Sequence, residues 1–123
     1  MASDAMKSVS RTLISRAELP NKQIIVVNAG IDGESEAILL YRDNEEIQAW
    51  LNICPHAGRR LDYAPGKFLM QDGDLVCAAH GATFRLDSGL CVAGPCRGAS
   101  LRAVAVEWRD DGVCLRSSSL GPI

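Results

Sequence analysis

The sequence has few of the side chains on which enzymes rely for catalysis. Its 123 residues include only two histidines, His56 and His80, so any mechanism that needs three or more imidazoles is excluded. Lysine and arginine number 13 against 15 aspartates and glutamates, for a formal net charge of -2. The longest basic run is Arg59-Arg60, and so no broad nucleic-acid-binding surface is indicated.

Long hydrophobic runs are also missing. The longest, at residues 24–27 and 38–41, fall far short of the roughly 20 apolar residues that span a membrane. The first seven residues lack the apolar stretch of a secretory signal. We therefore expect a soluble, cytoplasmic protein that does not contact a membrane. In that reducing compartment, its five cysteines are more often ligands, catalysts or small core residues than disulfides.

The hydrophobic pattern predicts a single all-β domain over residues 1–123. At this length a folded chain buries roughly two-thirds of the surface that its unfolded state exposes, which is enough for a core. Short β-branched segments alternate with clusters of Asp, Asn and Gly, which favour hairpin turns. Residues 45–51 also show helical spacing, but a strand directly after a turn fits their surroundings better. The predicted strands are residues 12–15, 23–28, 36–42, 47–52, 75–77, 83–86, 101–108 and 113–116, and the predicted turns are 28–33, 43–44, 72–74, 87–89 and 110–112.

Both histidines closely follow a cysteine. The two segments are Cys54-Pro55-His56 and Cys77-Ala78-Ala79-His80, each with a glycine within two residues of its histidine. A spacer of 20 residues separates His56 from Cys77. Four such side chains in two short loops predict a metal site. Tetrahedral zinc is one candidate, but each loop supplies one thiol and one imidazole, which suits a two-iron cluster with the two ligand types on different irons.

The two segments resemble the cluster-binding boxes of the Rieske [2Fe-2S] family, C-x-H and C-x-x-H-G. Gly94-Pro95 resembles the third loop of that family, which covers the cluster. The resemblance implies a small fold of antiparallel sheets, with a base domain at about residues 11–52 and 97–116 and a loop-built cluster-binding subdomain at about residues 53–96. It also implies one [2Fe-2S] cluster per chain, held by Cys54, His56, Cys77 and His80. The spacer between the boxes is a few residues longer than in most ferredoxins of the family.

The family resemblance implies an electron carrier and not an enzyme. Its expected partners are redox proteins: a flavin-dependent reductase that supplies the electron and an oxygenase that receives it. The oxygenase itself is excluded, because it adds a second domain with a mononuclear iron that needs two further histidines. Two alternatives stay open. One is a small Rieske subunit of another multi-component oxidoreductase, and the other is a zinc-stabilised β module that binds a partner without redox activity.

The residues after the second box predict a reduction potential near the bottom of the Rieske range. High-potential members place a serine and a tyrosine where this chain has Ala82 and Phe84, and both donate hydrogen bonds to cluster sulfur. Respiratory members also join their two loops by a disulfide, at positions that correspond here to Arg59 and Ala79. This chain has neither the two hydroxyl donors nor the cysteines for that disulfide, which argues against a quinol-oxidising subunit.

Three cysteines stand outside the boxes. Cys91 and Cys96 flank four residues of the third loop, so a bridge between them is conceivable, but two small apolar core residues are the favoured interpretation. Cys114 is expected to fill space in the last strand. Arg59 and Arg60 are interpreted as a solvated loop, or alternatively as a positive rim that docks an acidic partner. The two tryptophans, Trp50 and Trp108, are expected to anchor the core.

Overall fold

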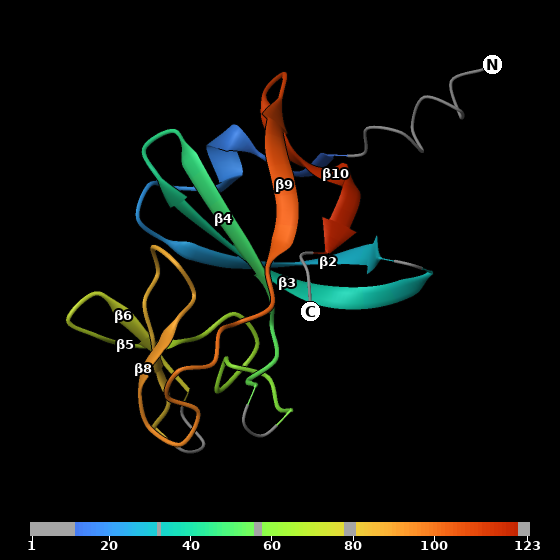
Figure 1. Cartoon of the computed structure of the whole chain (residues 1–123). Coiled ribbons are helices and arrows are strands. Elements are labelled where there is room, and N and C mark those ends of the chain that lie inside the picture. Colours follow the sequence, from blue (N-terminus) through green and yellow to red (C-terminus); the bar gives the residue numbers. More distant parts are fainter. Residues whose placement is uncertain (1–11, 32, 56–57, 78–80, 121–123) are drawn as a thin grey trace.

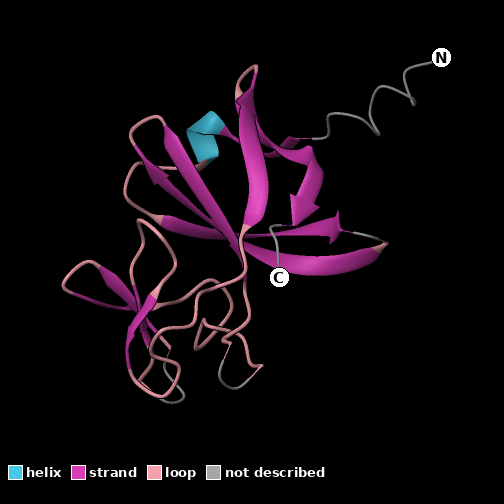
Figure 2. Ribbon diagram, viewed as in Figure 1, coloured by secondary structure: helices cyan, strands magenta, loops and turns pink. Residues whose placement is uncertain are grey.

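The chain folds into three antiparallel sheets. The computed structural model describes residues 12–31, 33–55, 58–77 and 81–120, and Figures 1 and 2 show the sheets as a larger base above a smaller unit. In the described residues, the base contains the sheets of strand order β1-β10-β9 and β2-β3-β4, and the smaller unit contains the sheet of order β5-β6-β7-β8. The strands are β1 (Thr12–Ser15), β2 (Ile24–Ile31), β3 (Glu34–Asp43), β4 (Glu46–Leu51), β5 (Leu69–Gln71), β6 (Asp74–Val76), β7 (Thr83–Phe84), β8 (Cys91–Ala93), β9 (Val104–Arg109) and β10 (Gly112–Leu120). The all-β prediction is confirmed, with one 3-10 turn, η1 (Arg16–Glu18), between β1 and β2.

Tight turns containing Asp, Asn or Gly connect several of the strands, as predicted. Asn44 joins β3 to β4 with a φ of 59°, and Asp110 joins β9 to β10 with a φ of 55°. Asp72 and Gly73 join β5 to β6 and both have positive φ. Asn and Asp tolerate this left-handed region better than other side chains, and glycine carries no Cβ that would clash there. The prediction of a strand directly after the 43–44 turn is also confirmed, because β4 begins at Glu46.

The predicted turn at residues 28–33 is wrong over its first four positions. Residues 28–31 continue β2, and each pairs with a residue of β3, from Asn28 opposite Ala37 to Ile31 opposite Glu34. Ile31 is buried in the base core. Cross-strand pairing therefore outweighs the low strand propensity of Asn28 and Gly30. The sequence also did not predict the short strands β5 and β8, and β9 begins at Val104 and not at residue 101.

Strand β3 separates two hydrophobic cores. Its side chains alternate between the faces of the sheet, so that Ile38 and Leu40 pack in the base core while Leu39 packs in the core of the smaller unit. All three are completely buried. Trp50 of β4 projects into the same smaller-unit core as Leu39 and is 2% exposed. One strand pair thus anchors the base and also forms a wall of the core that carries the cysteine loops.

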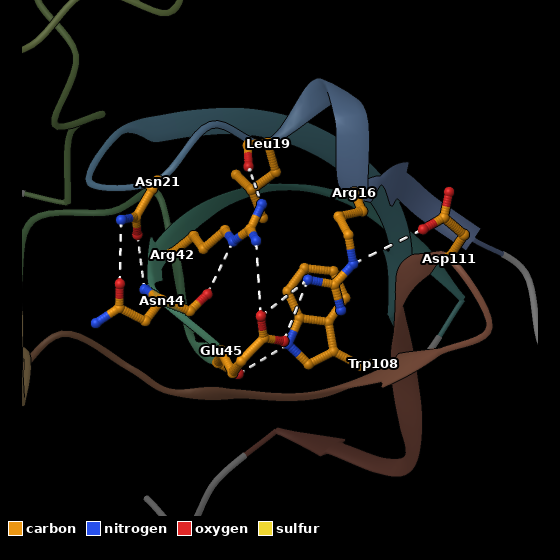
Figure 3. Close-up of polar contacts among 8 residues, drawn as sticks. All are labelled: Arg16, Leu19, Asn21, Arg42, Asn44, Glu45, Trp108 and Asp111. Carbon is orange, nitrogen blue, oxygen red and sulfur yellow. Dashed lines mark hydrogen bonds and ion pairs between the residues drawn. The ribbon is translucent and has the colours of Figure 1, made fainter.

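Trp108 is partly buried and packs against the base core from its edge. The ring is half-buried, and the Arg16 guanidinium covers it with Cζ 3.9 Å from the ring centroid. Figure 3 shows the Trp108 Nε1–H donating to the Glu45 carbonyl, at 2.8 Å, while the Glu45 carboxylate pairs with Arg16 at 3.1 Å. The expectation of a core anchor is therefore confirmed for Trp50, whereas Trp108 fastens η1 and the β3–β4 turn to β9.

None of the described residues forms a helix long and apolar enough to cross a membrane.

Candidate metal centre

Cys54 and Cys77 lie in the same buried core. Cys54 follows β4 by three residues and Cys77 directly follows β6. Both are completely buried, and they share the core of the smaller unit with Leu61, Ala82 and Phe84. Neither is in a disulfide. Two residues 23 positions apart in the sequence therefore bring thiol groups into one apolar interior.

The two cysteines begin loops with the same hydrogen-bond pattern. The Cys54 N–H donates to the carbonyl of the fifth residue on, Arg59, at 2.7 Å, and its carbonyl accepts from the fourth, Gly58, at 2.8 Å. The Cys77 N–H donates to the Ala82 carbonyl at 2.7 Å, and its carbonyl accepts from Gly81 at 2.9 Å. The two loops therefore share one pattern of backbone hydrogen bonds.

A glycine closes each of these loops for a conformational reason. Gly58 has a φ of 67° and Gly81 a φ of 76°, in the left-handed region that side chains with a Cβ rarely adopt. A Cβ at either position would meet nothing within 4 Å, so the requirement is backbone conformation and not space. The glycine that follows each predicted His ligand is thus explained by the turn that carries it.

His56 and His80 lie outside the described residues. The structure therefore brings together Cys54 and Cys77 of the predicted ligand set, and the two imidazoles stay a sequence prediction. Within the residues that it does describe, the side chains of His, Cys, Asp and Glu form no group of three that could hold a metal ion.

The third loop packs directly on the second. Gly94 has a φ of 94°, and a Cβ there would come within 2.8 Å of the Ala82 Cα and 3.1 Å of the Gly81 carbonyl oxygen. The third loop thus lies against the end of the Cys77 loop, and that Gly94-Pro95 covers a cluster stays a sequence prediction. Ala82 and Phe84 are completely buried and offer no side-chain donor to this interior.

A buried polar network supports the first loop, and the sequence analysis did not predict it. Asn52 is 1% exposed, and its Oδ1 accepts from the Leu61 N–H at 2.8 Å while its Nδ2 donates to Asp62 Oδ1 at 3.2 Å. The Arg60 guanidinium makes a bidentate pair with the Asp62 carboxylate, with both contacts at 2.9 Å. Gly66 N–H donates to Asp62 Oδ2 at 3.1 Å. The only signal in the sequence was a carboxylate in an apolar neighbourhood.

This network sets the charge state of Asp62. Burial alone would raise the pKa of its carboxyl group, because it disfavours the charged form. The hydrogen bonds from Arg60, Gly66 and Asn52 and the positive charge of Arg60 outweigh that effect and lower the pKa from 3.8 to about 2. Arg59 and Arg60 are both exposed, in agreement with a solvated loop, but the Arg60 guanidinium is paired with Asp62.

Cys91 and Cys96 lie side by side and flank residues 92–95 of the third loop. The Cys96 Sγ–H donates to Cys91 Sγ at 2.9 Å, and both side chains are buried. Burial raises the pKa of the Cys96 thiol to about 12, with further contributions from Cys91 and from Cys54. Their burial agrees with the interpretation as core residues, and no disulfide joins them.

The donor set fits a sulfur-ligated iron centre. Thiolates are soft ligands that suit Zn and iron–sulfur clusters, and the core around Cys54 and Cys77 is otherwise apolar. The two loops present their cysteines with equivalent backbone geometry. Backbone hydrogen bonds within each loop hold both cysteines, and the Cys54 side chain also interacts with Cys96.

The protein-family comparison gives one match, described as the Rieske [2Fe-2S] domain, over residues 11–108. None of the curated proteins matches the sequence.

Among solved structures, the chain is similar to the ferredoxin of carbazole 1,9a-dioxygenase from Nocardioides aromaticivorans IC177, with 22% identity, a TM-score of 0.64, and coverage of 88% of this chain and 97% of that one. It is also similar to a ferredoxin of Sphingomonas yanoikuyae B1, with 23% identity, a TM-score of 0.64, and coverage of 88% and 98%. A third similar structure is the terminal oxygenase of carbazole 1,9a-dioxygenase from Novosphingobium sp. KA1, at 22% identity and a TM-score of 0.70. That match covers 94% of this chain but 30% of the oxygenase.

Proposed function

Since this chain belongs to the Rieske [2Fe-2S] family, we propose that it carries single electrons on one such cluster, from a flavin-dependent reductase to an oxygenase. In this role it is an electron carrier and has no substrate-turnover site of its own. We also propose that it works in the cytoplasm.

The proposed ligands are Cys54 and Cys77 on one iron and His56 and His80 on the other. The observation that carries this assignment is the repeated loop, in which each cysteine makes the same pair of backbone hydrogen bonds and is completely buried. When bound, the cluster accepts and releases one electron, and imidazoles in place of two thiolates make the added electron easier to accept than in an all-cysteine centre.

The protein's own residues would bury and fix this site. Leu61, Ala82 and Phe84 exclude water from the side of the two thiols. The Asn52–Asp62–Arg60 network holds the chain that leaves the first loop. These contacts hold the loops in place and so limit structural change when the charge of the site changes, which is what an electron carrier requires.

The oxygenase as acceptor is supported by the names of similar structures. Two of these are ferredoxins, and one of them serves carbazole 1,9a-dioxygenase. A further similar structure is a complex of reduced oxygenase and oxidised ferredoxin of that enzyme system, at 17% identity and a TM-score of 0.67.

A second candidate is a small subunit of another multi-component oxidoreductase. The chain is similar to a protein described as the putative small subunit of a nitrite reductase, with 20% identity, a TM-score of 0.60 and coverage of 99% of that chain. A carrier dissociates from its partners between electron transfers, whereas a subunit stays bound. The test is whether the purified chain, added to a separate reductase and oxygenase, transfers electrons catalytically between them, as only a carrier would.

Metal and acid-labile sulfide analysis tests the cluster. Two iron and two sulfide per chain are expected, with a reduced-state EPR spectrum of the low average g value that mixed histidine and cysteine ligation gives. One zinc without sulfide would instead support the zinc-stabilised module and remove the electron-transfer proposal.

Variants test the ligands. Cys54→Ser and Cys77→Ser should each abolish cluster assembly, whereas Cys114→Ser, a matched control at a buried cysteine of the last strand, should keep full iron content. His56→Cys and His80→Cys should lower the potential or lose the cluster. An unchanged EPR spectrum in either histidine variant would show that the assigned ligands are wrong.

A further inference from the structure

Two thiols that the proposed function does not use face each other in the smaller unit. Cys91 is the first residue of β8, and Cys96 lies in the turn that follows this strand. The distance between their sulfur atoms is 2.9 Å. A disulfide bond is about 2.05 Å long, so a sub-ångström movement of the side chains separates this contact from a covalent bridge.

The backbone already holds the two residues in register. The Cys91 N–H donates to the Ala99 carbonyl at 2.8 Å, and its carbonyl accepts from Gly98 at 3.0 Å. The Ala99 N–H in turn donates to the Cys96 carbonyl at 2.8 Å. Both cysteines are therefore fastened to the same short segment, and closing a bridge would not require that segment to open.

Simple filling of space does not explain this arrangement. Two small apolar residues need no mutual orientation, yet the Cys96 Sγ–H points at Cys91 Sγ, and the Cys91 Sγ–H is directed at the Ala93 carbonyl at 3.2 Å.

We propose that Cys91 and Cys96 form a reversible dithiol–disulfide pair in the third loop. This modification site uses neither of the proposed cysteine ligands, although Cys54 lies close enough to Cys96 to interact with its thiol. Cys96 is 8% exposed against 1% for Cys91, and exposed residues surround it at Pro95 and Arg97. Cys96 is accordingly the more accessible of the two thiols, and Cys91 is the one that completes the bridge. Because the pKa of Cys96 is raised, little of it is the reactive thiolate, and we expect this oxidation to be slow.

The oxidant is a low-molecular-weight disulfide. The Cys96 sulfur attacks one of its sulfurs and forms a mixed disulfide, and the first small thiol leaves with the proton that Cys96 gives up. Cys91 then attacks the Cys96 sulfur, loses its own proton and releases the second small thiol. The protein loses two electrons and two protons, and the small disulfide gains both, so that one S–S bond replaces another.

Peptide mapping tests the pair in the full, iron-loaded chain. Cleavage after arginine and lysine places Cys91 and Cys96 together in residues 86–97, while Cys54, Cys77 and Cys114 fall in residues 43–59, 68–85 and 110–116. The protein is equilibrated with oxidised or with reduced glutathione, alkylated in denaturant and digested. After oxidation, about nine-tenths of peptide 86–97 should be unlabelled and lighter by the mass of two hydrogen atoms, and reduction should reverse this.

Three outcomes would overturn the proposal. They are full alkylation of peptide 86–97 after oxidation, glutathione left on Cys96 without a bridge, or a cross-link between peptides 43–59 and 86–97, which would make Cys54 the partner. Cys91→Ser should abolish the loss of two hydrogens, and Cys114→Ser should leave it unchanged. Iron and sulfide are counted on the same samples, so that failure of the cluster assignment is read separately from failure of the pair.

Discussion

Gly94 of the third loop lies against the backbone of Ala82 in the second, so closely that a Cβ on Gly94 would come within 2.8 Å of the Ala82 Cα. This contact joins the cover of the site to the loop that presents Cys77, because the Ala82 carbonyl accepts the Cys77 N–H. A displacement of the third loop would therefore move Ala82 and, through it, the proposed ligand Cys77.

Gly94→Ala should destabilise the protein and shorten the lifetime of its cluster. Alanine at positive φ costs about 1–2 kcal/mol, and the clash with backbone that cannot swing away adds about 1–3 kcal/mol. Gly98→Ala is the matched control, since Gly98 has a φ of 95° but nothing within 4 Å of its would-be Cβ. Urea unfolding and the rate of iron release measure both effects. Equal losses in the two variants would show that backbone strain, and not the contact with Ala82, matters.

The ionisation of Asp62 should make stability depend on pH in the acid range. The pKa of its carboxyl group is about 2 in the folded chain, against a reference value of 3.8. The folded state therefore favours the ionised carboxylate over the protonated form. This contributes about 2 kcal/mol, present above about pH 4 and lost as the pH falls towards 2. Asp62→Asn should cost about 1–3 kcal/mol at pH 6, and the difference from the natural chain should shrink on acidification.

The control for this pH dependence is Asp87→Asn, because Asp87 makes an exposed ion pair with Arg85 at 3.3 Å. Such surface pairs contribute little, and this variant should follow the natural chain at every pH. A stability gap for Asp62→Asn that stays constant from pH 6 to about pH 3 would show that packing, not charge, explains the loss.

The parts of the fold that were predicted are those with local causes. The turns at Asn44, Asp72 and Asp110 need positive φ, and their residue types reveal this directly in the sequence. The cysteine loops could be predicted for a similar reason, because the two predicted ligands and the closing glycine of each loop lie within five residues of sequence.

The features that the sequence did not reveal depend on contacts between distant segments. Residues 28–31 are a strand only because β3 pairs with them along their length. The bond of Asn52 to Asp62 joins residues ten positions apart, and its two partners carry no shared pattern. Cys91 and Cys96 could be recognised as neighbours in the chain, but the sequence did not reveal that their sulfur atoms lie 2.9 Å apart.

Asn52→Asp should weaken the support of the first loop. The new carboxylate could still accept from the Leu61 N–H, but it would replace the donor to Asp62 by a second negative charge at hydrogen-bond distance. Two carboxylates in a buried site repel, and we expect a loss of about 2–4 kcal/mol at neutral pH that becomes smaller when one of them is protonated. Chemical unfolding at pH 7 and pH 5 measures it.

Asn28→Asp, on an exposed position of β2, controls for the added charge and should change stability by less than about 0.5 kcal/mol. If Asn52→Asp were as stable as the natural chain, Asn52 would serve only to fill space.

The reduction potential should respond to donors placed at Ala82 and Phe84. Both are completely buried and lack the hydroxyl groups found at these positions in high-potential members of the family. A hydrogen bond to a charged acceptor is worth about 1.5–3 kcal/mol, and about 1.4 kcal/mol corresponds to 59 mV for one electron. Ala82→Ser and Phe84→Tyr should therefore each raise the midpoint by about 60–130 mV from a value near the bottom of the roughly -150 to +300 mV range.

The matched control is Thr83→Ser, which keeps a hydroxyl on the residue between them, where the Thr83 Oγ1 already donates to the Gly81 carbonyl at 3.2 Å. Its midpoint should stay within about 20 mV of the natural value, since no donor to the cluster is added.

A spectroelectrochemical titration measures the midpoint potentials of all four proteins. A natural midpoint above about +100 mV would contradict the low-potential assignment, because a centre without these donors would then reach the potential that they are invoked to explain. Unchanged midpoints in both hydroxyl variants would place the cluster sulfurs away from this wall of the core, and the proposed position of the site beside Ala82 and Phe84 would be wrong.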